Sequence, residues 1–334
     1  MTRACILGLA GPSLTTREAA FFRDVQPWGF ILFGRNIQTP EQVRDLTAAL
    51  RNSVGRPDAP ILIDQEGGRV QRLGPPHWPA YPPGKDYVRM DGADGRGRHL
   101  AWLGGRLIAG DLAALGINVD CAPVADVPVS GAHDVIGDRA FGSDPQQVAR
   151  LARAMAEGLL AGGVLPVVKH IPGHGRARAD SHKALPVVGA SLAELEASDF
   201  EAFRLLADLP MAMTAHVVFS AVDPIDSATT SVRVINDIIR GAIGFQGLLL
   251  SDDLSMEALN GDLESRARRS LAAGCDLVLH CNGSLGEMRQ VVSGVAELSG
   301  RGAERALLAL ARLTGTPEPF DAEAGRAQLA SALR

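Results

Sequence analysis

Short apolar runs alternate with amphipathic stretches along the whole chain. The apolar runs have the length of β-strands and no regular polar positions, which is typical of strands buried on both faces of a parallel sheet. The stretches between them have helical periodicity, and many open at Ser, Thr or Asp and end at Gly. The pattern predicts eight strands at residues 5–9, 29–33, 60–63, 117–122, 165–169, 211–215, 247–251 and 275–279.

The order of the elements predicts an α/β fold. Amphipathic helices are expected at residues 39–54, 144–160, 191–207, 231–243 and 265–273. Eight strand–helix units are what a (β/α)8 TIM-type barrel requires, although a doubly wound open sheet has the same alternation. Neither a linker rich in Pro and Ser nor a step in composition divides the chain. We therefore expect one catalytic barrel domain over residues 1–334, with its core at about 4–300 and an extra C-terminal helix within a helical extension at 301–334.

Composition and charge limit the class of protein. The chain has 334 residues, of which 46% are hydrophobic and 21% are charged, so it can bury a large core. Its formal charge of -5 carries no block of one sign, which argues against nucleic acid as a partner. The apolar runs are too short to span a membrane, and Gly11 and Pro12 interrupt the first one, so we interpret it as a strand rather than a signal peptide. We expect a cytoplasmic monomer.

Polar and ionisable residues gather at the ends of the expected strands. In a barrel of this type the active site lies at the carboxyl ends of the strands, so these positions indicate function. Burying so many charged groups in a purely structural core would be costly. The residues concerned are Arg35 and Asn36 after the second strand, Asp64, Gln65 and Glu66 after the third, Asp120 and Asp126 on and after the fourth, Lys169 and His170 at the fifth, His216 after the sixth, Asp252 and Asp253 after the seventh, and His280 and Asn282 after the eighth.

This set of side chains suits a sugar. Carboxylates and cations bind several hydroxyl groups at once, and cleavage of a glycoside adds a carboxylate nucleophile and a proton donor. Asp252, at the end of an apolar strand, fits the nucleophile. The residues that fit the sugar-binding role are Asp64, Arg72, Arg139, Lys169 and His170.

The proton donor is expected in the stretch 164–186. This stretch is a short apolar strand followed by a polar loop, and the loop carries Asp180, Ser181 and His182. A His that is oriented by a carboxylate can give and take a proton near neutral pH, so His182 with Asp180 can act as acid and then as base. We interpret His174, between two glycines, as a residue that shapes this loop. The loop from 171 to 186 is expected to close on substrate.

At these positions the sequence resembles the β-N-acetylhexosaminidases of glycoside hydrolase family 3, in particular the single-domain bacterial enzymes that release N-acetylglucosamine from peptidoglycan fragments. The matching motifs are ILFGRN at 31–36, IDQEGGRVQR at 63–72, the Asp-Arg pair at 138–139, KHIPGHG at 169–175 with DSH at 180–182, MTAH at 213–216 and LLLSDDLSM at 248–256.

The resemblance implies retaining hydrolysis through a covalent glycosyl-enzyme intermediate. It implies Asp252 as nucleophile and His182, supported by Asp180, as acid/base. The residues implied in binding the sugar ahead of the scissile bond are Asp64, Arg72, Arg139, Lys169 and His170. It implies no cofactor, and a small soluble glycan or muropeptide as substrate; only 4% of the residues are aromatic, which disfavours a platform for a long polysaccharide.

Several alternatives remain open at this point. Asp253 could be the nucleophile in place of Asp252, or the substrate's acetamido oxygen could attack while both aspartates assist. A phosphorylase could use the same residues, because His182 would not repel phosphate as a Glu would. A metal-dependent barrel hydrolase could use His170, His174, His182 and His216, but the chain has no His-x-His motif and no ligand on the first strand. A binding module without catalysis would not need Asp252 and His182.

The four cysteines point to no further chemistry. They are Cys5, Cys121, Cys275 and Cys281, and they lie in or beside strand-like segments without a CxxC pair. Scattered cysteines of this kind are typical of buried, reduced thiols rather than of disulfides or a zinc site. We therefore expect no metal.

Overall fold

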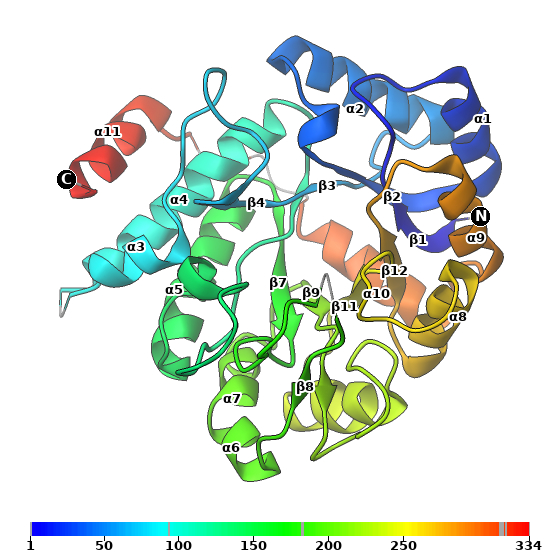
Figure 1. The fold of residues 1–334 in the computed structure, drawn as a ribbon. Helices are drawn as coiled ribbons and strands as arrows, with labels where there is room; N and C mark the ends of the chain where they lie inside the picture. The colour runs from blue at the N-terminus through cyan, green and yellow to red at the C-terminus, as the bar shows by residue number, and fades with distance from the viewer. Residues whose placement is uncertain (1, 93, 182–183, 314–316, 318, 334) are drawn as a thin grey trace.

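Eight parallel strands form a closed barrel in the computed structural model, which describes residues 2–92, 94–181, 184–313, 317 and 319–333 (Figure 1). Going round the barrel, the strands follow the order β1-β12-β11-β9-β7-β6-β3-β2. The (β/α)8 prediction is confirmed, and the open sheet is excluded because β1 pairs with both β2 and β12. The strands are β1 (Arg3–Leu7), β2 (Pro27–Leu32), β3 (Ile61–Ile63), β6 (Val119–Asp120), β7 (Leu165–Ile171), β9 (Met211–Thr214), β11 (Leu248–Asp253) and β12 (Leu277–His280).

The barrel strands are buried on both faces, as their apolar runs predict. Every residue of β2, β7, β9 and β12 is buried. Neighbouring strands are in parallel register, for example Leu250 beside Met213 and Val168 beside Ala212. Parallel strands present their carboxyl ends at one mouth, so the polar residues that follow them are brought together there.

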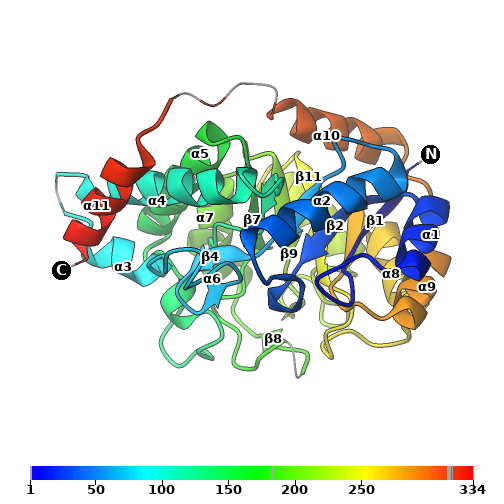
Figure 2. The ribbon, with the colours of Figure 1, turned by 90° about the horizontal axis from the view of Figure 1, so that it is seen from above.

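Helices surround the barrel, as Figures 1 and 2 show. Several begin at side chains that accept a hydrogen bond from the first turn, including Thr39, Asp144, Ser191 and Asp262. The helices are α1 (Thr16–Val25), α2 (Pro40–Val54), α3 (Gly84–Arg89), α4 (Arg96–Ala113), α5 (Pro145–Ala161), α6 (Leu192–Ala197), α7 (Asp199–Arg204), α8 (Leu263–Ala273), α9 (Leu285–Ser293), α10 (Gly300–Ala311) and α11 (Ala322–Ala332), with the short 3-10 helices η1 (Gly34–Asn36) and η2 (Gly137–Arg139) and the π-helix η3 (Val234–Ala242).

Two short sheets lie in the loops that follow barrel strands. The antiparallel pair β4 (Gln65–Gly67) and β5 (Val70–Gln71) follows β3. The parallel pair β8 (Val187–Val188) and β10 (Val218–Phe219) joins the loops after β7 and β9. In Figure 2 both sheets lie toward the lower side of the molecule, and α10 lies on the upper side.

The helix predictions need three corrections. The stretch 191–207 forms two helices, because the chain breaks at Ser198 between α6 and α7. Most of the stretch 231–243 is a π-helix rather than an α-helix. The C-terminal extension forms two helices instead of one, since the end of the chain folds as α11 and pairs Arg326 with Asp111 of α4. The boundary between core and extension stays a prediction.

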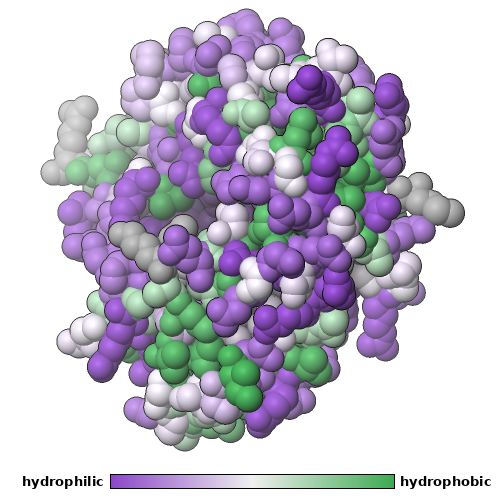
Figure 3. Space-filling model, turned by 45° about the vertical axis from the view of Figure 1, so that its right-hand side comes forward, coloured by the Kyte–Doolittle hydropathy of each residue, from purple (hydrophilic) through white to green (hydrophobic). Residues whose placement is uncertain are grey.

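The structure shows the state of the cysteines and the character of the surface. All four cysteines are free thiols and buried. On the face shown in Figure 3, hydrophilic residues predominate and hydrophobic residues form smaller patches. Of the helices in the described residues, none combines the length and the apolar character needed to cross a membrane.

Candidate active site

A cavity of about 310 Å³ opens at the carboxyl ends of the barrel strands. Its walls come from segments far apart in the sequence, including the ends of β7 and β11 and the loops after β3 and β6. Apolar side chains such as Met213 and Met256 line part of it. Six of the eight residues predicted for the site line this cavity: Asp64, Arg72, Arg139, Lys169, His170 and Asp252.

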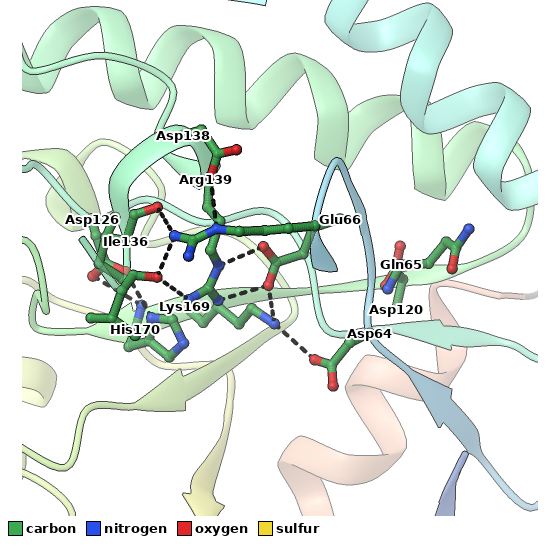
Figure 4. A network of polar contacts seen from close by, with 12 residues as sticks. Asp64, Gln65, Glu66, Asp120, Asp126, Ile136, Asp138, Arg139, Lys169 and His170 are labelled. Carbon is green, nitrogen blue, oxygen red and sulfur yellow. Dashed lines mark hydrogen bonds and ion pairs between the residues drawn. The ribbon is translucent and has the colours of Figure 1, made fainter. Parts of the chain in front are cut away.

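Five charged side chains at the cavity, of which Glu66 and Lys169 are buried, form what we term the cation–carboxylate network: Asp64, Glu66, Arg72, Arg139 and Lys169. Lys169 Nζ lies 2.9 Å from Asp64 Oδ1 and 2.7 Å from Glu66 Oε1. Arg139 donates to both oxygens of Glu66, each at 2.8 Å (Figure 4). Arg72 donates to Asp64 Oδ2 at 3.0 Å. Two carboxylates and three cations therefore lock one another in place.

The charges of this network hold each other ionised. Burial raises the pKa of Asp64 and of Glu66, but the cations Lys169, Arg72 and Arg139 outweigh it, so that the pKa of Asp64 falls well below its usual range and that of Glu66 falls to about 2. Burial likewise lowers the pKa of Lys169, and the two carboxylates more than reverse this and raise it above its ordinary value. The network therefore keeps its charges across the whole physiological pH range.

The loop after β3 is folded so that Arg72 returns to Asp64. Gln65 organises this turn, because its side-chain oxygen accepts hydrogen bonds from the backbone N–H groups of Arg72 and Leu73, at 2.9 and 3.0 Å. Gly67 has a positive φ of 94°, and a Cβ at this position would lie 2.3 Å from the carbonyl oxygen of Pro82. Only glycine fits there without a backbone shift. The steric limit at Gly67 thus explains why the motif at 63–72 has glycine at this position.

The other half of the site is what we term the histidine cluster: Asp126, His170, His174 and Ser181. Asp126 Oδ2 lies 2.7 Å from His170 Nδ1, and Asp126 Oδ1 accepts the backbone N–H of His174 at 2.6 Å. His174 Nε2 lies 3.0 Å from the hydroxyl of Ser181. Burial, together with the nearby His170, lowers the pKa of His174 to about 4, so this ring is neutral at neutral pH. The cluster therefore connects the floor of the cavity with the loop after β7.

Asp252 projects into the cavity from the end of β11. Burial raises its pKa, but His216, His170, the backbone N–H of Asp253 and Lys169 favour the charged form, and the pKa falls below its usual value. Burial also lowers the pKa of His216, so this histidine is neutral at neutral pH. The backbone N–H of Asp253 and the charge of Lys169 still favour the ionised form of Asp252 under these conditions. An ionised carboxylate in a cavity that can hold a sugar has the properties of a nucleophile.

Asp253 is occupied by structural hydrogen bonds. Its Oδ1 accepts backbone N–H groups from Ser255 and Cys281, each at 3.1 Å, and its Oδ2 accepts the hydroxyl of Ser255. The carbonyl oxygen of Asp253 lies 3.0 Å from Nε2 of the buried His216. These contacts fix the end of β11, and they favour Asp252 over its neighbour as the reacting carboxylate.

The DSH motif that carries the predicted proton donor is described only at its first two residues. His182 lies outside the described residues. Asp180 lies in the loop between β7 and β8, and the next residue, Ser181, is buried against His174 and lines the cavity. The middle residue of the DSH motif thus lies at the cavity.

Two residues in the site were underestimated from the sequence. Glu66 and Asp126 follow β3 and β6, where sequence inspection notes them only as polar residues at strand ends. Glu66 joins Lys169 to Arg139, and Asp126 holds His170. Their partners are distant in sequence, so no local pattern reveals the pairing. Within the described residues no group of three or more His, Cys, Asp or Glu side chains could hold a metal ion.

Comparison with known families gives a match over most of the chain. The family model described as the glycosyl hydrolase family 3 N terminal domain matches residues 11–309. The beta-hexosaminidase of Alkalilimnicola ehrlichii is 43% identical over 283 residues, which is 83% of this chain and 80% of that protein. The beta-hexosaminidase of Pseudomonas aeruginosa is 39% identical over 322 residues, or 95% of this chain and 89% of that protein.

Solved structures agree with the sequence relatives. NagZ from Neisseria gonorrhoeae in complex with N-trifluoroacetyl-D-glucosamine has a TM-score of 0.88 at 34% identity, covering 99% of this chain and 98% of that one. A glycoside hydrolase family 3 β-N-acetylglucosaminidase from a Paenibacillus species has a TM-score of 0.86 at 29% identity, covering 98% of this chain and 67% of that one.

Proposed function

We propose, on the premise that this chain belongs to glycosyl hydrolase family 3, that it is a retaining exo-β-N-acetylglucosaminidase acting on peptidoglycan fragments. The family and the beta-hexosaminidases that cover most of the chain make it a β-N-acetylhexosaminidase. The retaining mechanism, the muropeptide substrate and the roles of individual residues are the proposal.

In the first step Asp252 attacks the anomeric carbon of the terminal N-acetylglucosamine. A bond forms between this carbon and a carboxylate oxygen of Asp252, while the bond to the leaving oxygen breaks. His182, oriented by Asp180, gives its proton to that oxygen as it departs. The single observation that supports this assignment is geometric: Asp252 lines the cavity from the end of β11, while both side-chain oxygens of its neighbour Asp253 are engaged in hydrogen bonds.

In the second step water reverses the chemistry. His182, now unprotonated, takes a proton from water as the water oxygen attacks the anomeric carbon, and the bond to Asp252 breaks. The two inversions leave the product sugar in the β configuration, and His182 is again protonated. Neither step requires a metal or a cofactor.

The cation–carboxylate network is proposed to bind the sugar ahead of the scissile bond. Asp64 can accept hydrogen bonds from sugar hydroxyls, while Arg72, Arg139, Lys169 and His170 can donate to them. Because each of these charges is already paired with an opposite charge, the network need not reorganise when the sugar enters. The cavity of about 310 Å³ suits one terminal sugar rather than a continuous polysaccharide chain, which supports exo action on a short glycan.

The wider setting is part of the same proposal. The low aromatic content, 4%, fits a soluble muropeptide better than an extended polymer. We propose that the protein works in the cytoplasm as a monomer, without nucleic acid or membrane partners.

A panel of aryl β-glycosides that differ only at the 2-position tests this function. Hydrolysis of the N-acetylglucosaminide with little or no hydrolysis of the glucoside is expected, followed by release of N-acetylglucosamine from disaccharide–peptide wall fragments. Equal activity on both aryl glycosides would contradict the assignment. Adding phosphate distinguishes the phosphorylase, because formation of a sugar 1-phosphate would replace hydrolysis.

A further inference from the structure

A buried ion pair lies at the base of the loop that carries Asp180. Arg176 Nε donates to Asp199 Oδ2 at 2.5 Å, and the two side chains are 19% and 0% exposed. Arg176 follows the PGHG turn and precedes Asp180 by four residues. Asp199 is the first residue of α7, so the pair connects the loop after β7 with a helix outside the barrel.

The break between α6 and α7 is what presents Asp199 to the loop. The sequence pattern of 191–207 is that of one amphipathic helix, but the chain turns at Ser198 and α7 begins anew at Asp199. Asp199 Oδ1 has no hydrogen-bond partner among the described residues. A carboxylate in such a position needs compensation, and Arg176 supplies it.

The loop is close-packed at the same place. A Cβ on Gly173 would lie 2.9 Å from the Cβ of Asp199, and a Cβ on Gly175 would lie 2.1 Å from the carbonyl oxygen of Val127. The PGHG turn is therefore enclosed by α7 on one side and by the loop after β6 on the other. Arg176 is the point at which the chain leaves this enclosed turn toward Asp180.

We propose that Arg176 and Asp199 are a positioning pair, which fixes the base of the loop against α7 and so supports proton delivery from the DSH motif that begins at Asp180. The inference rests on the proposed function, since it concerns the delivery of a proton by His182 with Asp180. A buried ion pair adds little net stability compared with apolar packing, so stabilising the fold is a weak reason for this pair to be there. Placing the loop is a role that apolar residues would not fulfil as specifically.

The test compares leaving groups in Arg176→Ala. An N-acetylglucosaminide of 4-nitrophenol hardly needs protonation of its leaving oxygen, whereas one of phenol or methanol depends on it. Arg176→Ala should lower kcat/KM for the poor leaving group by about tenfold more than for 4-nitrophenol, which is a fraction of what general acid catalysis contributes. Arg176→Lys can still pair with Asp199, so its ratio of kcat/KM between the poor leaving group and 4-nitrophenol should lie between those of Arg176→Ala and the wild type.

Arg305→Ala is the matched control. Arg305 pairs with Asp276 at the opposite end of the barrel, just before β12, and the side chains are 16% and 6% exposed. This variant should leave the ratio between leaving groups unchanged, even if its melting temperature falls. If Arg176→Ala does not fold, the double variant Arg176→Gln with Asp199→Asn removes both charges, and it should change the ratio in the same direction.

The outcomes separate this inference from the function on which it rests. A wild-type protein inactive on every N-acetylglucosaminide would refute the proposed function. An active wild type with the same ratio in Arg176→Ala, or an equal change in Arg305→Ala, would overturn the positioning role alone.

Discussion

The two halves of the cavity hold polar groups in opposite ways. The cation–carboxylate network is made of charges that compensate one another, with Lys169 between Asp64 and Glu66. The histidine cluster is held by hydrogen bonds to one carboxylate, Asp126, and contains a ring that is neutral at neutral pH. Asp252 lies within electrostatic reach of both, through Lys169 and His170.

The difference teaches how one site can combine rigidity with proton chemistry. A network with fixed charges can bind sugar hydroxyls at any physiological pH. The histidine cluster contains His174, which gains a proton only as the pH falls toward 4, and through Ser181 it is joined to the loop that carries the predicted acid. Changes in the two halves should therefore have different consequences.

Replacement of the carboxylate that both halves face should have the largest effect. Asp252→Asn keeps the shape of the side chain but removes its charge and most of its nucleophilicity. We expect kcat/KM to fall by a factor on the order of 10⁴ or more, without loss of the fold. Steady-state kinetics measures kcat/KM, and circular dichroism checks that the fold is retained. Asp24→Asn, at an exposed ion pair with Arg23, is the control and should stay near wild type; an Asp252→Asn variant of comparable activity would refute the role of Asp252.

Breaking the cation–carboxylate network should be the most damaging change to stability. Lys169→Met removes the buried cation between Glu66, which is buried, and Asp64, which is partly buried, and the unfolding free energy should fall by about 3–5 kcal/mol. Urea denaturation measures it. Arg44→Met, which breaks an exposed pair with Glu41, should lower stability by less than about 1 kcal/mol. Equal losses in the two variants would mean that the network is not coupled as described.

The histidine cluster should determine stability in mildly acidic solution. The pKa of His174 is about 4 in the folded protein against 6.5 for an ordinary histidine, so the unfolded chain binds more protons between these values. Its contribution is present above pH 6.5 and is lost as pH falls toward 4, by up to about 3 kcal/mol. Glu66, with a pKa of about 2 against 4.5, loses its contribution only at lower pH.

Urea denaturation from pH 7 to pH 4 checks this prediction. His174→Gln should flatten the fall in unfolding free energy over that range, whatever its effect at pH 7. His77→Gln, at an exposed position, should leave the pH dependence as it is. An unchanged slope in His174→Gln would show that His174 does not titrate in the folded protein as described.

Removal of metal ions should have the smallest effect. The proposed steps use Asp252, His182 and water, so dialysis against a chelator should leave kcat/KM unchanged. Loss of activity that returns on adding a divalent metal would favour the metal-dependent hydrolase instead.

The barrel could be predicted from the sequence because each of its strands is encoded by a local run of apolar residues. Each of the eight apolar runs overlaps a barrel strand, and the closure of the barrel makes their polar ends meet. The break at Ser198 was not predictable, since the amphipathic pattern continues through it. The pairing of Glu66 with Arg139 joins residues 73 positions apart, and no local pattern encodes it.

The site was predicted in part for the same reasons. Six of the eight residues line one cavity because each lies near the carboxyl end of a barrel strand or in the loop that follows it. The placement of Ser181 depends on two contacts that the sequence does not reveal. Ser181 contacts His174, and the backbone of His174 is held by Asp126, which follows β6. The roles of all eight residues stay predictions.

Trapping the covalent intermediate tests the central claim most directly. A slowly reacting fluorinated N-acetylglucosaminide is incubated with the protein, and the peptides are mapped by mass spectrometry. We predict a sugar-sized mass increase on the peptide that contains Asp252, and none in Asp252→Asn. An adduct on another residue, or no adduct while the substrate is turned over, would contradict a covalent route through Asp252.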